Sequence, residues 1–387
     1  MNKGSLASLN NKQVILTNYK KYFFSVSKFF SLLIFLIPVL SCTKTVREVG
    51  PAPPPAPVNS SYKNGVFVVN EGNFNWGNAT ITFINANDSV EQDVYGARNG
   101  NNHLGDVAES MQLFNDKGYI IVNNSNKIQI VSLEDFKSVK TLSGLNSPRF
   151  LAIVDSTKAY VTNMQRNISV IDLTTLSIKK SIPTLGWTEA LIKYNNFMFV
   201  SSIGIESAAS ANRNARILVI DLKSDMIVDS IKTGKEPVSM VIDKKDKIWV
   251  LCTGGYDHFE SPTLVRIDPA LRVVDKVFSF PNLNDTPSRL CINASKDTIY
   301  FLNNGVYQMP VSMTAIPSSP FIPSNGHLFY GLGIHPLNGN IFVSDAKDYI
   351  QNGEVYQYDQ VTGKVLNSFP AGRIPGSFCF TAQAKKK

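Results

Sequence analysis

Charged and aromatic side chains recur at one kind of position in this sequence, the start of a short apolar run that is typical of a β-strand. PRFLAIV, EALIKY, PSRLCIN and YGLGIHP are four of these runs. Two arginines, several carboxylates and aromatic rings together suit a polar ligand of medium size with amide groups and an apolar body. The same carboxylates could instead hold the catalytic metal ion of a hydrolase. The side chains at these starts are Asp106, Glu109, Arg149, Trp187, Glu189, Glu236, Arg289 and Tyr330.

Large aromatic residues also stand in long loops, where a turn does not need them. The four long loops are EGNFNWGNA at 71–79, SIGIESAASANRNA at 202–215, TGGYDHFESP at 253–262 and DAKDYIQN at 345–352. Their large side chains are Phe74, Trp76, Tyr256, His258, Phe259 and Tyr349. Loops carried on a rigid scaffold are where binding residues concentrate, and aromatic rings supply large contact areas. We expect these residues to contact a ligand; packing of loop against loop is the alternative.

A sequence repeat predicts the strands that carry both the strand-start side chains and the aromatic loops. Residues 158–182, KAYVTNMQRNISVIDLTTLSIKKSI, predict three strands, and the first two are apolar on both faces. No helical pattern follows that could cover such a sheet, so another copy of the sheet must cover it. Copies recur every 40 to 49 residues, which is typical of a β-propeller. The turn that follows the third strand of each copy falls at Asn85, Ser132, Asp172, Asp221, Asp268, Pro310 and Asp359.

Seven turn positions predict an all-β fold, a seven-bladed β-propeller. The first copy supplies only three strands, GVFVVN, ATITFIN and SVEQDV. Its missing inner strand is available in PGSFCFT, residues 375–381, because this segment matches the inner strands of the other copies. The C-terminal strand is therefore expected to complete the first blade and to close the ring, which leaves no sheet edge open at the joint. Trp249, inside KIWVLC, is expected to pack between blades.

The N-terminal residues indicate export and lipidation. Residues 1–28 carry five lysines and no acid, and the uncharged segment FFSLLIFLIPVLS that follows is too short to span a bilayer comfortably. We interpret residues 1–41 as a signal peptide. Val39-Leu40-Ser41-Cys42 is similar to the lipobox of bacterial lipoproteins, which predicts an acylated Cys42; an ordinary signal peptide with a chance cysteine is the alternative. Residues 42–63 then form a Pro-rich linker, residues 64–381 the propeller and residues 382–387 a basic tail.

Composition argues against two classes of function. The formal charge of +8 falls to +3 without the five leader lysines, and no basic stripe remains, so nucleic-acid binding has no support. Cys252, Cys291 and Cys379 stand at unrelated spacings within predicted strands, which favours buried free thiols over a disulfide framework or a zinc site. Single histidines at His103, His258 and His327 are weak metal-site signals, and no H-E-x-x-H or G-x-S-x-G motif occurs. We expect no enzyme activity, metal or cofactor.

The sequences of several segments resemble those of known propeller families. AYVTN and ISVIDL resemble the YVTN or YncE-like family. FVVNEGNFNWGNATITFIN, LGDVAESMQLFNDKGYIIVNNSNKIQIV and GIHPLNGNIFVSDAKDYIQNGEVYQYD resemble, more narrowly, cell-surface propeller lipoproteins of Gram-negative bacteria. The resemblance runs from about Gly65 to Phe380. It implies a lipid-anchored protein of the outer membrane that accompanies a TonB-dependent receptor, and one branch of that family captures corrinoids for a cobalamin receptor. The segment Thr-Lys-Thr-Val-Arg-Glu after Cys42 lacks the acidic run that often marks export to the cell surface. The sequence therefore does not indicate whether the protein faces the cell exterior or the periplasm.

These observations predict a monomeric binding lipoprotein that captures a small ligand, a corrinoid or an iron chelate, for a TonB-dependent receptor. A protein-docking scaffold and, with less support, a metal-dependent lactonase-like hydrolase are the alternatives. The residues expected to bind the ligand are Phe74, Trp76, Arg149, Trp187, Glu189, Tyr256, His258, Phe259, Arg289, Tyr330 and Tyr349.

Overall fold

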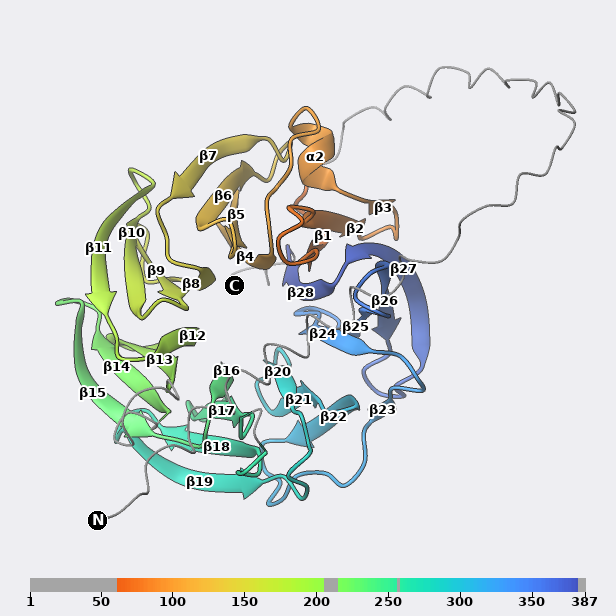
Figure 1. Cartoon of the computed structure of the whole chain (residues 1–387). Helices are drawn as coiled ribbons and strands as arrows, with labels where there is room; N and C mark the ends of the chain where they lie inside the picture. The colour runs from red at the N-terminus through yellow and green to blue at the C-terminus, as the bar shows by residue number, and fades with distance from the viewer. Residues whose placement is uncertain (1–60, 205–214, 256–257, 382–387) are drawn as a thin grey trace, which may run out of the picture. The chain divides into compact units, whose positions relative to one another are not determined.

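A computed structural model describes residues 61–204, 215–255 and 258–381. These residues form seven four-stranded antiparallel sheets arranged as blades around a common axis (Figure 1). The region along this axis, bounded by the inner strands, is named the channel. The prediction of a seven-bladed propeller is confirmed. The leader, Cys42, the linker up to residue 60, Tyr256 and the tail 382–387 lie outside the described residues. In the described part of the chain, no helix is long and apolar enough to cross a membrane.

The strands of each blade are given from the channel outward. Blade 1 contains β28 (Pro375–Phe380), β1 (Gly65–Asn70), β2 (Thr80–Asn85) and β3 (Val90–Glu91). Blade 2 contains β4 (Ala108–Phe114), β5 (Lys117–Val122), β6 (Lys127–Ser132) and β7 (Ser138–Ser143). Blade 3 contains β8 (Pro148–Ile153), β9 (Lys158–Asn163), β10 (Asn167–Asp172) and β11 (Ser177–Pro183). Blade 4 contains β12 (Trp187–Tyr194), β13 (Phe197–Ile203), β14 (Arg216–Asp221) and β15 (Met226–Lys232).

The remaining three blades follow the same order. Blade 5 contains β16 (Pro237–Ile242), β17 (Ile248–Cys252), β18 (Thr263–Asp268) and β19 (Val273–Ser279). Blade 6 contains β20 (Ser288–Ile292), β21 (Thr298–Leu302), β22 (Gly305–Pro310) and β23 (Ile322–Pro323). Blade 7 contains β24 (Phe329–Ile334), β25 (Ile341–Asp345), β26 (Asn352–Tyr358) and β27 (Val365–Arg373).

The two apolar faces of each central strand pack against different neighbours. In β9, Tyr160 and Val161 are adjacent and both fully buried. Val161 packs with Ile121 of blade 2, whereas Tyr160 packs with Val200 of blade 4. The core is therefore a series of layers between blades, and each blade covers the next. Trp249 is likewise fully buried, and it belongs to a cluster with Ile299 and Phe301 of blade 6, as expected of a residue that packs between blades.

The turns after the third strands use their acidic residues as predicted. The Asp172 Oδ1 atom accepts the amide hydrogens of Thr174 and Thr175 at 2.8 and 2.9 Å. Asp221, Asp268 and Asp359 repeat this pattern in blades 4, 5 and 7. Hydrogen bonds to the ionised carboxylate hold the pKa of each aspartate below its usual range. The largest contribution comes from a backbone amide at Asp172 and Asp221, from the Lys247 side chain at Asp268 and from the Thr362 hydroxyl at Asp359.

The ring closes through the C-terminal strand. β28 pairs with β1 in antiparallel register, from Val66 opposite Phe380 to Asn70 opposite Pro375. Thr381 extends the joint, because its Oγ1 atom accepts the Gly65 amide hydrogen at 2.7 Å. The last inner strand is thus the inner strand of the first blade, and this part of the fold prediction is confirmed as well.

Blade 1 departs from the expected pattern at its outer edge. SVEQDV was expected to form an outer strand, but only Val90 and Glu91 pair with β2, and the short helix α2 (Val94–Arg98) follows. The Asp93 carboxylate accepts the Gly96 amide hydrogen at 3.1 Å and caps the helix start. Burial of Val94 and Tyr95 against blades 1 and 2 replaces the contacts that a longer strand would have made.

Candidate functional site

A β-bulge near the start of each inner strand places one residue per blade at the channel. The ladder between the inner and second strands skips a register there in all seven blades. Such a bulge leaves a residue unpaired and re-aims its side chain. We name the first bulged residues the bulge ring: Gly376 in blade 1, Glu109, Arg149, Glu189, Val238, Arg289 and Tyr330 in blades 2 to 7.

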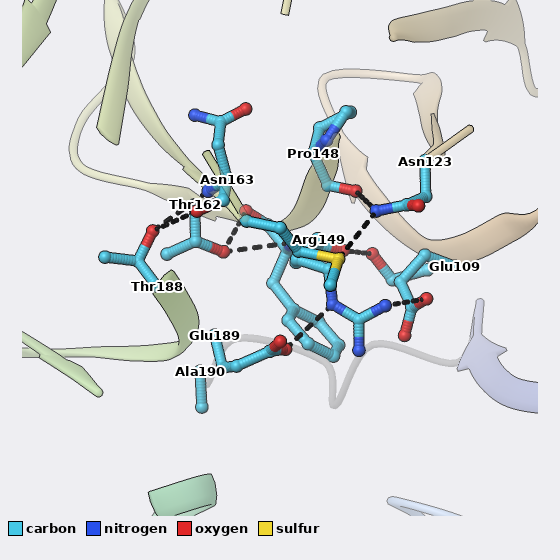
Figure 2. A network of polar contacts seen from close by, with 12 residues as sticks. Glu109, Asn123, Pro148, Arg149, Thr162, Asn163, Thr188, Glu189 and Ala190 are labelled. Atoms are coloured by element: carbon cyan, nitrogen blue, oxygen red, sulfur yellow. Dashed lines mark hydrogen bonds and ion pairs between the residues drawn. The ribbon is translucent and has the colours of Figure 1, made fainter. Parts of the chain in front are cut away.

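In blades 2 to 4, the bulge ring forms an acid–base–acid bridge. Arg149 lies between two carboxylates (Figure 2): its Nε atom is 2.8 Å from Glu189 Oε2, and its Nη1 atom contacts Glu109 Oε2. Glu109 and Glu189 are only 3 and 6% exposed. Burial raises the pKa of Glu189, and Arg149 offsets part of that rise. Burial would lower the pKa of Arg149, but the two carboxylates outweigh it and raise that pKa.

Hydrogen bonds from the neighbouring blades hold the strand that carries Arg149 and the strand paired with it. Asn123 Nδ2 in blade 2 donates to the Pro148 carbonyl at 3.0 Å. On the other side, Thr188 in blade 4 donates its hydroxyl hydrogen to the Asn163 carbonyl at 3.0 Å (Figure 2). The position of the Arg149 guanidinium is therefore fixed by the backbone around residue 149 as well as by its two carboxylate partners.

In blades 6, 7 and 1, a second cluster forms around Glu71, the residue after β1. Arg289 Nη2 lies 3.3 Å from Glu71 Oε1, and the Tyr330 hydroxyl donates to Glu71 Oε2 at 3.0 Å. Arg289 also donates from Nε to the Tyr330 carbonyl at 3.1 Å, and its guanidinium lies over the Tyr330 ring. Gly376 leaves room for this carboxylate, because a Cβ atom at Gly376 would lie 2.2 Å from Glu71 Oε1.

The surroundings of Glu71 favour its neutral form. Burial, followed by repulsion from Glu109, raises the pKa of Glu71 to about 7, although Arg289 lowers it. Burial and the neighbouring Glu71 also raise the pKa of Tyr330. Sequence reasoning did not single out Glu71. The available signal was its position, directly after an apolar strand and at the head of the long loop 71–79.

Five of the eight residues predicted near the channel belong to these two clusters; Asp106, Glu236 and Trp187 do not. Asp106 Oδ2 accepts the Asn75 amide hydrogen at 2.8 Å and thereby orders the loop 71–79. Glu236 Oε2 accepts the Thr253 hydroxyl hydrogen at 2.9 Å within blade 5. Both side chains act as strand-end groups that fix loops. Trp187 begins β12 opposite Ile203 and is partly exposed.

The aromatic residues of the long loops are exposed at the face where the inner strands begin. Phe74 and Trp76 are 65 and 72% exposed, and Phe259 is also exposed. Tyr349 connects this loop face to the channel, because its ring packs edge-on against Tyr330 at 5.7 Å. The loops of blades 1 and 7 also touch, since Asn73 Nδ2 donates to the Tyr349 carbonyl at 2.6 Å.

Histidines and cysteines take no part in the two clusters. His258 Nδ1 lies 3.0 Å from the Leu283 carbonyl, and His327 Nδ1 lies 2.8 Å from Asp345 Oδ2. The thiols of Cys252, Cys291 and Cys379 are free, and burial raises the pKa of each to about 12. Across residues 61–204, 215–255 and 258–381, no group of three or more His, Cys, Asp or Glu residues could hold a metal ion.

Comparison with protein families gives one match that spans the propeller. The family described as "Domain of unknown function (DUF5074)" matches residues 64–374. The chain belongs to the DUF5074 family. No curated protein matches the sequence significantly.

Solved structures similar to this DUF5074 chain share its fold at low sequence identity. A quinonprotein alcohol dehydrogenase-like protein from Bacteroides thetaiotaomicron is 18% identical, with a TM-score of 0.64, over 84% of this chain and 80% of that one. Kuenenia stuttgartiensis hydrazine synthase is 14% identical, with a TM-score of 0.53, over 68 and 85% of the two chains. The dihydro-heme d1 dehydrogenase NirN is 13% identical, with a TM-score of 0.54, over 85 and 78%. At these identities the similarity concerns the propeller fold alone.

Proposed function

We propose that the protein is a non-enzymatic binding lipoprotein of the outer membrane. On this proposal its loop face captures a small ligand, a corrinoid or an iron chelate, and passes it to a TonB-dependent receptor. The observation that carries the proposal is the exposure of Phe74 and Trp76 beside a channel mouth that is lined with charged groups.

Exposed aromatic rings favour a binding role, because a ring that stays in water adds nothing to the folding free energy. A side chain such as Trp76 gains free energy only when a partner removes it from water. Tyr349 lies next to Tyr330, so a ligand that covered the loop aromatics would also reach the bulge ring. The channel mouth would then supply hydrogen-bond donors and acceptors to the polar periphery of the ligand.

The channel clusters favour binding over hydrolysis. Glu109, Glu189 and Glu71 each form an ion pair with a guanidinium, which would compete with a metal ion for these carboxylates. A corrinoid suits the mixed character of the site, since it has an apolar body and peripheral amides. A corrinoid is the first ligand to test because the strand sequences resemble those of the lipoprotein family described above.

Replacement of Trp76 by alanine tests the loop face. Trp76→Ala is expected to weaken ligand binding by about 1 to 3 kcal/mol, with little change in melting temperature, because exposed aromatic anchors dominate such interfaces. Isothermal titration calorimetry with cyanocobalamin, haem and a ferric siderophore measures the effect. Leu271→Ala is the matched control, because Leu271 is also 72% exposed but lies in the β18–β19 turn on the opposite face.

Two results would contradict the capture proposal. One is that none of the three ligands binds at micromolar concentration, in which case a pull-down for a receptor protein would test the docking alternative. The other is that Trp76→Ala and Leu271→Ala bind a ligand equally well.

Membrane anchoring is tested separately at Cys42. The wild-type protein is expected to float with membranes, since an acyl chain contributes about 0.8 kcal/mol for each buried CH₂ group. Cys42→Ala removes the acylated residue and should shift the protein to the soluble fraction. Density-gradient fractionation followed by immunoblotting measures the distribution. If Cys42→Ala stays in the membrane fraction as fully as the wild type, lipidation at this residue is wrong.

A further inference from the structure

Ion pairing in the bridge of Glu109, Arg149 and Glu189, named the Arg149 bridge, uses only part of each charged group. Arg149 donates from Nε to Glu189 Oε2 at 2.8 Å and from Nη1 to Glu109 Oε2. No described residue accepts a hydrogen bond from its third nitrogen, Nη2 (Figure 2). Likewise, no described residue donates to Oε1 of Glu109 or of Glu189. One donor nitrogen and two acceptor oxygens are therefore left over.

These three atoms stay accessible although their side chains are largely buried. The side chains of Glu109 and Glu189 are 4 and 7% exposed, and that of Arg149 is 22% exposed. In the described part of the chain, the side-chain atoms that are closed off from solvent without a partner are Asp106 Oδ1, Asn167 Oδ1 and Thr263 Oγ1, and none of them belongs to the bridge. Arg149 Nη2 and the two Oε1 atoms therefore keep contact with solvent, which they reach at the channel because the bulge ring lies there.

A donor beside an acceptor in a rigid frame selects a ligand group with the opposite order. A primary carboxamide has this order, because its carbonyl oxygen and one of its N–H bonds point to the same side of the amide plane. The carbonyl oxygen accepts from Arg149 Nη2 while that N–H donates to Oε1 of Glu109 or of Glu189. A secondary amide fits poorly, since its trans geometry points the N–H bond away from the carbonyl oxygen.

The charge of the bridge makes the same selection. Two carboxylates share one guanidinium here, so a ligand carboxylate placed at Arg149 Nη2 would lie next to Glu109 and Glu189 and be repelled. A primary amide is neutral and leaves the charge of the bridge unchanged. It also supplies an acceptor to a guanidinium nitrogen that would lose its contact with water beneath a bound ligand.

The second channel cluster lacks this arrangement. Glu71 uses both of its oxygens, because Oε1 pairs with Arg289 Nη2 and Oε2 accepts the Tyr330 hydroxyl hydrogen. Among the described residues, Arg289 Nη1 has no acceptor, but no free carboxylate oxygen of Glu71 lies beside it. This cluster can donate to any carbonyl group, so a preference for primary amides arises in blades 2 to 4.

We infer that the Arg149 bridge is a subsite for a primary carboxamide side group of the captured ligand. The subsite rests on the proposed function, since it lies where the inner strands begin, on the side of the loop face. It narrows the ligand to compounds that carry primary amides. Among the candidate ligands it favours an amidated corrinoid over haem, whose propionate groups are carboxylates.

NMR spectroscopy of the full chain with isotope-labelled arginine tests the subsite with small probes. Propionamide is expected to shift the Nε signal of Arg149 along a saturating curve, whereas N-methylpropionamide and propionate should leave it in place at equal concentration and ionic strength. The Arg289 signal is the internal control, because a lone donor does not distinguish the two amides. Arg149→Lys identifies the Arg149 signal by its loss. Should that variant fail to fold, Phe150→Leu identifies the signal, since the Phe150 ring lies 5.9 Å from Arg149 Cζ.

Calorimetry with cyanocobalamin tests the same subsite on a whole ligand. The comparison compounds are derivatives in which one peripheral amide is hydrolysed to a carboxylic acid. At least one derivative is expected to bind about tenfold more weakly than cyanocobalamin, because its carboxylate meets Glu109 and Glu189. Arg149→Lys keeps the positive charge but has no planar second donor, so it should reduce this difference to about threefold or less. Arg289→Lys is the matched control and should keep the difference.

Two sets of results would overturn the inference. In the NMR experiment, they are the absence of a saturable shift at Arg149 with propionamide, or an equal shift with propionate or N-methylpropionamide. In calorimetry, they are equal binding of cyanocobalamin and all its acid derivatives, or a difference that Arg149→Lys retains. If cyanocobalamin does not bind, the corrinoid is removed from the proposed function, and the propionamide comparison decides the subsite by itself.

Discussion

Deletion of residues 375–387 is expected to abolish cooperative folding of the propeller. The deletion removes all of β28, so β1 loses the partner that pairs with it from Val66 to Asn70. Phe378 and Phe380 also pack against Phe342, with ring centroids 6.0 and 5.5 Å apart, and this part of the layer between blades 7 and 1 would be lost. An open ring exposes an unpaired strand edge and apolar surface, which favours aggregation.

Circular dichroism during heating and size-exclusion chromatography measure this effect. The truncated chain should lack a sharp melting transition and elute as aggregates. Deletion of residues 382–387 alone is the control, because it keeps Thr381 and its hydrogen bond to Gly65, and it should melt as the full chain does. A chain that ends at residue 374 but melts with wild-type cooperativity would show that β28 does not seal the ring.

Replacement of Arg149 by methionine is expected to cost about 3 to 5 kcal/mol of folding free energy at neutral pH, because it leaves two buried carboxylates without their partner. The loss should shrink as the pH falls. Burial already raises the pKa of Glu189, and without Arg149 that pKa rises further in the folded state, so the folded variant binds more protons than the unfolded chain does in mildly acidic solution. Its stability relative to the wild type then increases with decreasing pH.

Urea denaturation at pH 5 and pH 8 measures both parts of this prediction. The triple variant Glu109→Gln, Arg149→Met, Glu189→Gln removes the charges together with the arginine and should recover part of the loss. If Arg149→Met is equally destabilising at both pH values, the loss reflects packing of the long side chain instead of uncompensated charge.

The repeat made most of the fold predictable. Adjacent apolar residues such as Tyr160 and Val161 required a cover on both faces, and the structure supplies it with the neighbouring blades. Turn acids such as Asp172 marked the blade spacing because a local hydrogen bond fixes each turn. Both signals lie within one blade, where a sequence pattern reports directly on structure.

The channel clusters were only partly predictable, because their partners come from distant parts of the sequence. Arg289 was singled out as a candidate, but its carboxylate partner Glu71 lies 218 residues away. Gly376, whose missing side chain makes room for Glu71, shows no pattern that distinguishes it from a turn glycine. The bulges that aim these side chains depend on the pairing of strands, which the order of residues in one strand does not reveal.

The hydrogen bond between Thr381 and Gly65 joins residues 316 positions apart, and this affects the order in which the protein can be built. Blade 1 emerges first during synthesis, yet it lacks its inner strand until the last described residues of the chain have been made. Six blades can assemble in sequence order, but the nascent ring keeps an open strand edge at blade 1 throughout translation. Completion of the circle is therefore a late step, and the unfinished chain needs protection from association with other chains until that step has occurred.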